Sequence, residues 1–173
     1  LPLEHIDLYN VDTPEEDIKT LYFQILQKGM HGICFSLYED GQKPGDIISE
    51  GQIRRRLEIL KPYTNWVRSF STIEGNELIP KIAKEMGMKT LVGAWLGDDK
   101  EKNEIEVESL IQLCHEGFVD IAAVGNEVLY RNDLTLSELL EKIDYVKSQI
   151  LEIPMGYVDA YYEFGRHPEL VDA

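Results

Sequence analysis

Short apolar runs alternate along the chain with stretches in which apolar residues recur at helical spacing. The runs of strand length cover 31–38, 65–70, 88–95, 119–124 and 153–158. The amphipathic stretches, bounded by capping residues or glycines, predict helices near 14–28, 49–60, 76–86, 103–116 and 135–150, with Thr13 and Thr135 as caps of the first and last. The fourth helix is expected to bury Ile105, Leu110, Ile111 and Cys114, and the fifth Leu139, Ile143, Val146 and Ile150. Strands and helices therefore follow one another in repeated βα units.

This alternation indicates an α/β fold in which helices cover a parallel sheet. The units recur about every 30 residues, and eight of them would need roughly 250 residues, the usual size of a (β/α)8 TIM barrel. Five strands alone can also form an open doubly wound sheet. However, no glycine-rich phosphate loop follows the first strand, and polar residues gather just after the strands. We therefore predict a TIM barrel of which this chain holds about the first five βα units.

The predicted domain organisation has two parts. Residues 1–30 form an N-terminal segment with one helix, which we expect to pack against the bottom or side of the barrel. Residues 31–173 form the first part of an incomplete barrel. Because the fifth strand would then be an open edge with an exposed apolar face, the isolated chain should be poorly soluble, dimeric or stabilised by further residues.

Composition narrows the range of partners. The 173 residues include 17 Lys or Arg and 32 Asp or Glu, which gives a formal net charge of −15. This balance argues against nucleic acid, phosphorylated substrates and anionic membranes, because all three select for basic residues. It is consistent with a neutral polysaccharide or oligosaccharide. No run approaches the roughly 18 apolar residues of a membrane span, and no signal peptide is visible, so the compartment is not indicated.

The histidines and cysteines do not have the spacing of a metal site, and we expect neither a metal nor a cofactor. Cys34 and Cys114 are the two cysteines, and each lies within an apolar run. Such positions predict buried thiols rather than a disulfide framework.

Reacting groups in parallel α/β folds sit at the carboxyl ends of the strands. The candidates at these positions are Tyr38, Arg68, Trp95, Asn126, Glu127, Asp159 and Tyr161. Glu127 follows an apolar strand directly, so we expect its carboxylate near low-dielectric walls, which favour the protonated form that a general acid needs. In a second interpretation, Glu127 caps the next segment or pairs with Arg131.

The remaining candidates have alternatives of the same kind. The Asn126 amide can bond a substrate hydroxyl. Aromatic rings at strand ends can stack on the C–H faces of sugars, or they can simply pack in the core. Arg68 lies in an apolar strand, where a buried guanidinium needs a partner. It either orients a catalytic carboxylate or closes a structural ion pair.

In several segments the sequence resembles the bacterial branch of glycoside hydrolase family 17, the β-1,3-glucanases and related transglycosidases. The matching segments are Gly32-Ile-Cys-Phe-Ser-Leu-Tyr-Glu-Asp-Gly-Gln42, Pro62-Tyr-Thr-Asn-Trp-Val-Arg-Ser-Phe-Ser-Thr72, Leu91-Val-Gly-Ala-Trp-Leu96, Val124-Gly-Asn-Glu-Val-Leu-Tyr-Arg131 and His167-Pro-Glu-Leu170. They cover residues 31–173 in order, and together they are far more specific than any one of them alone.

The resemblance implies a retaining O-glycosyl hydrolase or transglycosidase, similar to an endo-β-1,3-glucanase. It implies that Glu127 is the general acid/base and that Asn126 bonds the 2-hydroxyl of the sugar being cleaved. Sugar contacts are implied for Tyr38, Arg68, Trp95, Asp159 and Tyr161. Phe35 stands where many members have tyrosine, so a hydroxyl is missing at that position.

Retaining glycosidases need a second carboxylate, the nucleophile, about 5 Å from the first. The resemblance places it after the seventh strand, in a Gly-Glu-(Thr or Ser)-Gly-Trp-Pro-like motif that the 173 residues do not contain. We therefore expect the chain alone to be catalytically incomplete, with the nucleophile in a missing C-terminal part of the same polypeptide or in a second chain. The alternative is a non-catalytic half-barrel that binds carbohydrate or serves assembly.

Overall fold

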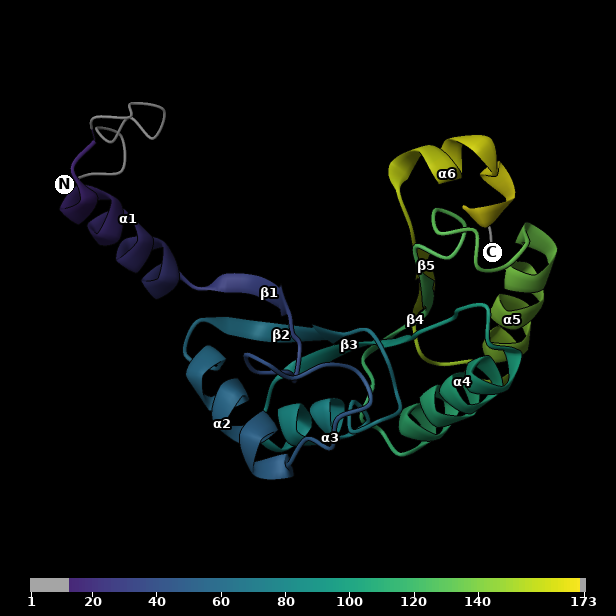
Figure 1. Ribbon diagram of the computed structural model, residues 1–173, viewed down its shortest axis with the longest axis horizontal. Helices are drawn as coiled ribbons and strands as arrows, with labels where there is room; N and C mark the ends of the chain where they lie inside the picture. The colour runs from purple at the N-terminus through teal and green to yellow at the C-terminus, as the bar shows by residue number, and fades with distance from the viewer. Residues whose placement is uncertain (1–12, 172–173) are drawn as a thin grey trace.

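The computed structural model describes residues 13–171, and its elements follow the predicted alternation (Figure 1). The strands are β1 (Met30–Cys34), β2 (Thr64–Ser69), β3 (Lys89–Ala94), β4 (Ile121–Asn126) and β5 (Met155–Val158). The helices are α1 (Glu15–Lys28), α2 (Glu50–Leu60), α3 (Leu78–Glu85), α4 (Lys100–His115), α5 (Leu136–Gln149) and α6 (Tyr161–Arg166), followed by a short 3-10 helix, η2 (Pro168–Leu170). Residues 1–12 of the predicted N-terminal segment lie outside the described residues.

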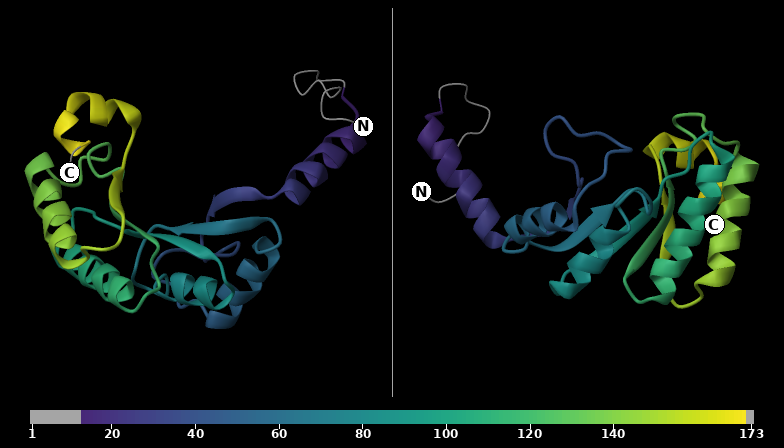
Figure 2. Two further views of the ribbon diagram at one scale, coloured as in Figure 1. Left: turned by 180° about the vertical axis from the view of Figure 1, so that it is seen from behind. Right: turned by 60° about the horizontal axis from the view of Figure 1, so that its bottom comes forward.

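The strand order distinguishes between the two predicted architectures. All five strands are parallel, and they lie side by side in sequence order, β1-β2-β3-β4-β5. A doubly wound sheet reverses its strand order part-way and carries helices on both faces. Here α2, α3, α4 and α5 all lie along the outer side of a curved sheet (Figures 1 and 2). The α/β fold is confirmed, and its arrangement is that of successive units of a barrel.

The core lies between the sheet and the outer helices. On the sheet side, Val67, Val92 and Val124 are each at most 1% exposed. One cluster joins β3 and β4 to α4 and α5, and a second packs α2 and α3 against β2 and the segment after β1. The predicted stripe of α5 is confirmed, since Leu139, Ile143, Val146 and Ile150 are all buried.

Two burial predictions are wrong. Ile105 of α4 is 57% exposed, because the covered face of α4 instead carries its neighbours Glu106 and Val107 together with Leu110, Ile111 and Cys114, which are buried as predicted. Cys34 is exposed, whereas Cys114 is buried as expected. Cys34 is in register with Arg68 on the inner face of the sheet, and β1 is an edge strand.

The inner face of the sheet contrasts with the outer one. Arg68, Leu91 and Ile121 are neighbours across the strands, and each is only half-buried. No helix of residues 13–171 covers this face (Figure 2). The curved sheet thus presents an uncovered inner face of mixed polar and apolar side chains.

The first helix is present but does not pack as expected. α1 begins at Glu15, with Pro14 rather than Thr13 as its N-cap residue, and it points away from the sheet (Figures 1 and 2). Only Gly29, in a conformation with φ 77°, separates α1 from β1, so the connection is too short for the helix to fold back. Within the part of the chain that the structure describes, no helix is long and apolar enough to cross a membrane.

Candidate active site

The carboxyl end of β4 and the residue that follows it have an unusual backbone. Gly125 has φ 89°, and a Cβ atom there would lie 2.8 Å from Cγ2 of Val128, so the position requires glycine. Glu127 has φ 54°, in the left-handed region that is strained for a residue with a side chain, at a cost of about 1 kcal/mol or more. Its backbone N–H donates to the Val158 carbonyl at 2.7 Å, which holds the turn against β5.

The Glu127 side chain does not lie where the sequence suggested. It is exposed, so the expected low-dielectric walls are not provided by residues 13–171. The alternative pairing with Arg131 is also wrong, because the Arg131 Nε donates to Asp133 Oδ2 at 2.6 Å. The structure thus presents an exposed carboxylate directly after the carboxyl end of β4.

Arg68 reaches from β2 to the end of β4. Its Nη2 donates to Oδ1 of Asn126 at 2.7 Å, and its Cζ lies 4.6 Å from the centre of the Phe70 ring. Both sequence interpretations of Arg68 expected a carboxylate partner, and both are corrected by this amide. Because the amide oxygen accepts from Arg68, the Asn126 Nδ2 is the end of the amide that can donate to a ligand hydroxyl.

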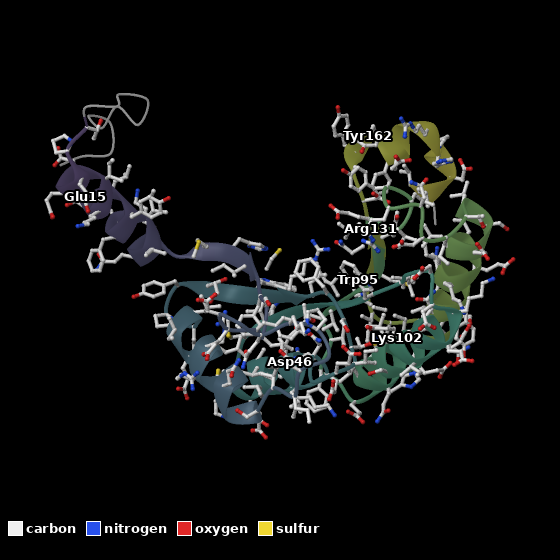
Figure 3. All side chains as sticks on the ribbon, in the orientation of Figure 1. Glu15, Asp46, Trp95, Lys102, Arg131 and Tyr162 are labelled. Carbon is white, nitrogen blue, oxygen red and sulfur yellow. The ribbon has the colours of Figure 1, made fainter. Side chains whose placement is uncertain are left out.

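Arg131, which the sequence suggested only as a partner of Glu127, has a different role in this site. Its Nη1 donates to the Asn126 carbonyl, and its Nη2 donates to the Leu96 carbonyl at 3.0 Å. Its Cζ lies 4.2 Å from the centre of the Trp95 ring, and Figure 3 shows the two side chains next to each other inside the curve of the sheet. The sequence feature that could have indicated these contacts is an arginine in a tight loop, two residues before Asp133.

A cavity of about 400 Å³ opens beside Trp95, at the carboxyl ends of β1, β2 and β3. Its aromatic and polar lining residues include Phe35, Tyr38, Phe70, Trp95, Asn103 and Glu106. The structure therefore brings Tyr38 and Trp95, both predicted at strand ends, to one cavity. Trp95 remains 40% exposed, so part of its ring is open to a ligand.

Glu106 of α4, a buried carboxylate at this cavity, was missed by the sequence analysis. Its two oxygens accept from the Ser71 hydroxyl, the Thr72 backbone N–H at 2.7 Å and the Trp95 backbone N–H at 3.2 Å. Burial raises the pKa of Glu106, and these hydrogen bonds oppose that rise. Its four-residue spacing from the buried Leu110 was the signal that placed Glu106 on the covered face of the helix.

A family profile described as the BtgE/BtgC glycoside hydrolase domain matches residues 32–173. The chain belongs to this glycoside hydrolase family. It is 33% identical over 117 residues to a glucan 1,3-beta-glucosidase of Schizosaccharomyces pombe, a match that covers 61% of this chain and 36% of that protein. It is 32% identical over 113 residues to the glucan 1,3-beta-glucosidase of Saccharomyces cerevisiae, covering 63% of this chain and 36% of that protein.

A solved structure agrees with the fold of this glycoside hydrolase domain. It is an active-site mutant of Rhizomucor miehei beta-1,3-glucanosyltransferase in complex with laminaritriose, which matches with a TM-score of 0.67 and 26% identity. The match covers 80% of this chain and 52% of the fungal one. The domain thus spans about half the length of the solved relative and 36% of the length of the curated ones.

In this glycoside hydrolase domain, Asp159 clamps the loop that follows Glu127. Its Oδ2 accepts from the Leu129 backbone N–H at 3.1 Å, the Tyr130 backbone N–H at 3.4 Å and the Tyr157 hydroxyl. Burial, followed by the nearby Asp159 carboxylate, raises the pKa of Tyr157, so its phenol stays protonated and donates. The observed contacts of Asp159 are therefore structural, and its sugar contact stays a prediction.

Tyr161 follows Asp159 by two residues and lies at the surface. It begins α6 and is 88% exposed, with its ring edge-on to Tyr162 at 5.5 Å between centroids. Figure 3 shows the neighbouring Tyr162 well above Trp95, at α6. Among the described residues, no group of three or more His, Cys, Asp or Glu could hold a metal ion.

Proposed function

We propose that this domain is part of a family 17 retaining glycoside hydrolase or transglycosidase that acts on β-1,3-glucan. The observation that carries the proposal is the end of β4, where a strained turn presents the exposed Glu127 carboxylate beside an Asn126 amide held by Arg68. The similar proteins, glucan 1,3-beta-glucosidases and a beta-1,3-glucanosyltransferase, support the linkage and the substrate.

In this mechanism Glu127 acts twice. As an acid it protonates the leaving glycosidic oxygen while a nucleophilic carboxylate forms the glycosyl–enzyme bond. As a base it then removes a proton from the incoming water or sugar hydroxyl, which displaces that carboxylate and restores the protonated acid. The Asn126 Nδ2 donates to the sugar 2-hydroxyl, an interaction that strengthens in the transition state.

The nucleophile has to lie about 5 Å from Glu127. We propose that the rest of the polypeptide or a second chain supplies it and also covers the inner face of the sheet. That cover would surround Glu127 with the apolar walls that residues 13–171 do not provide. The rings of Tyr38 and Trp95, which line one cavity, would stack on glucosyl units.

The test is turnover of β-1,3-gluco-oligosaccharides by the full-length protein, with products identified by mass spectrometry. Glu127→Gln should lower kcat by about 10²- to 10⁴-fold, because the amide keeps the shape but cannot transfer the proton. Glu152→Gln is the matched control, since Glu152 is exposed before β5, at the opposite end of the sheet. Shorter products indicate hydrolysis, and longer ones indicate transfer. Undiminished turnover by Glu127→Gln would contradict the proposal, and binding without turnover by the unaltered protein would favour the non-catalytic carbohydrate-binding or assembly module.

A further inference from the structure

We infer that Arg131 is a positioning residue that holds the Trp95 ring and the Asn126–Glu127 turn at a fixed separation. The inference rests on the proposed function for its catalytic consequence. Arg131 itself is assigned no contact with substrate. Its guanidinium instead links the segment after β3 to the end of β4, and these segments carry the aromatic surface and the acid/base.

The first support is the register of the sheet. The pairing of β3 with β4 ends at Ala94 and Val124. The carbonyls that Arg131 binds belong to Leu96 and Asn126, each two residues beyond that last pair. The Arg131 side chain thus provides one further link between the two segments, just beyond the last residues whose backbones pair.

The second support is the position of the Trp95 ring. The guanidinium lies over the ring at 4.2 Å, and the Trp95 backbone N–H is held by Glu106 at 3.2 Å. Trp95 is therefore fixed from two elements, while part of its ring stays open to the cavity. The same guanidinium that contacts the ring also binds the carbonyl of the residue immediately before Glu127.

Arginine is needed for this arrangement. The Arg131 Nε donates to Asp133, and its two Nη atoms donate to the Asn126 and Leu96 carbonyls. One planar guanidinium therefore makes hydrogen bonds in three directions. The Asp133 carboxylate compensates the charge. A lysine keeps the charge, but its ammonium is compact and is carried on a flexible side chain. It cannot donate to both carbonyls and also lie flat on the Trp95 indole.

The experiment compares Arg131→Lys with Arg54→Lys in the full-length protein. Arg54 is a suitable control because it is also paired with carboxylates, Glu50 and Glu85, on the outer helices. Hydrogen exchange of the backbone amides at 95–97 and 126–129 should speed up about tenfold in Arg131→Lys, and should not change in Arg54→Lys. Unchanged exchange at both segments would overturn the inference, whatever the activity.

Kinetics test the functional part. Arg131→Lys should lower kcat/KM for β-1,3-gluco-oligosaccharides by about 10- to 100-fold, because the misplaced ring and turn no longer act together. The double variant with Trp95→Ala should lose about fivefold less than the product of the two single losses. Independent, multiplying losses would overturn the positioning role. If hydrogen exchange speeds up in Arg131→Lys but the unaltered protein has no turnover, the proposed function fails. The structural role of Arg131 in linking the two segments is then still supported.

Discussion

The outer and inner faces of the sheet differ in what their side chains contact. On the outer face, Val67, Val92 and Val124 are packed beneath helices supplied by this chain itself. On the inner face, Arg68 and Leu91 are half-buried, and no helix of residues 13–171 lies over them. The difference indicates that the outer face holds these five units together, whereas the inner face and its upper edge carry the candidate chemistry.

The largest expected effect compares two leucines on opposite faces. In the 173-residue chain, Leu110→Ala should lower the free energy of unfolding by about 2–5 kcal/mol, because Leu110 is fully buried against the sheet. Leu91→Ala on the inner face should cost less than about 1 kcal/mol. Urea denaturation of both variants measures the difference. Equal losses would show that the two faces are not distinct.

Arg68→Met tests the upper edge of the inner face. Removal of the charged donor frees the Asn126 amide, and hydrogen bonds to charged groups contribute about 1.5–3 kcal/mol. If that energy is used in the transition state, kcat/KM on β-1,3-gluco-oligosaccharides should fall by about 10- to 150-fold. Arg55→Met is the control, since Arg55 pairs with Glu39 on the exposed surface. A loss of the same size in both variants would argue against an oriented amide.

Asp159→Asn tests whether Asp159 holds the loop after Glu127 in place or contacts the sugar. In either orientation the amide nitrogen would face a backbone N–H, that of Ala160 or those of Leu129 and Tyr130, so unfolding should become easier by about 1–2 kcal/mol. The Tyr130 bond is long and exposed, which limits the loss. We expect KM to change less than stability, as measured by thermal unfolding and initial rates. A raised KM at unchanged stability would instead make Asp159 a sugar ligand.

The smallest effect lies on the outer helices. Thr135→Ala removes the capping box of α5 and should cost about 1 kcal/mol. The Thr135 backbone N–H, the Lys100 ammonium and the Thr135 hydroxyl, which the alanine removes, lower the pKa of Glu138 to about 2. A lowered carboxyl pKa adds stability that is complete above about pH 4.5 and is lost as the pH falls toward 2. Thermal unfolding measured between these pH values should show that acidification lowers the stability of Thr135→Ala less than that of the unaltered protein.

The sequence predicted the outer face better than the inner one, for a physical reason. Apolar stripes such as Leu139, Ile143 and Val146, and caps such as Thr135, depend on neighbours within one or two helical turns. The partner of Arg68 lies 58 residues away, and the carbonyls that Arg131 bridges become neighbours only through the strand register. No local pattern carries those contacts.

The remaining errors have similar causes. α1 was expected to pack on the barrel, but the single residue between it and β1 sets its direction. Glu106 sits among apolar residues because its hydrogen-bond partners come from two other loops, after β2 and after β3. Acidic spacing within α4 could not reveal those partners.

The most direct test of the central claim, that Glu127 is the acid/base, is the leaving-group dependence of the rate in the full-length protein. Aryl β-glucosides or laminaribiosides with leaving groups of different acidity would be compared in the unaltered protein and in Glu127→Gln. Good leaving groups need no protonation, so the variant should approach the normal glycosylation rate with the most acidic phenol and fall far below it with poor leaving groups. A uniform loss across the whole series, or no loss at all, would contradict the account.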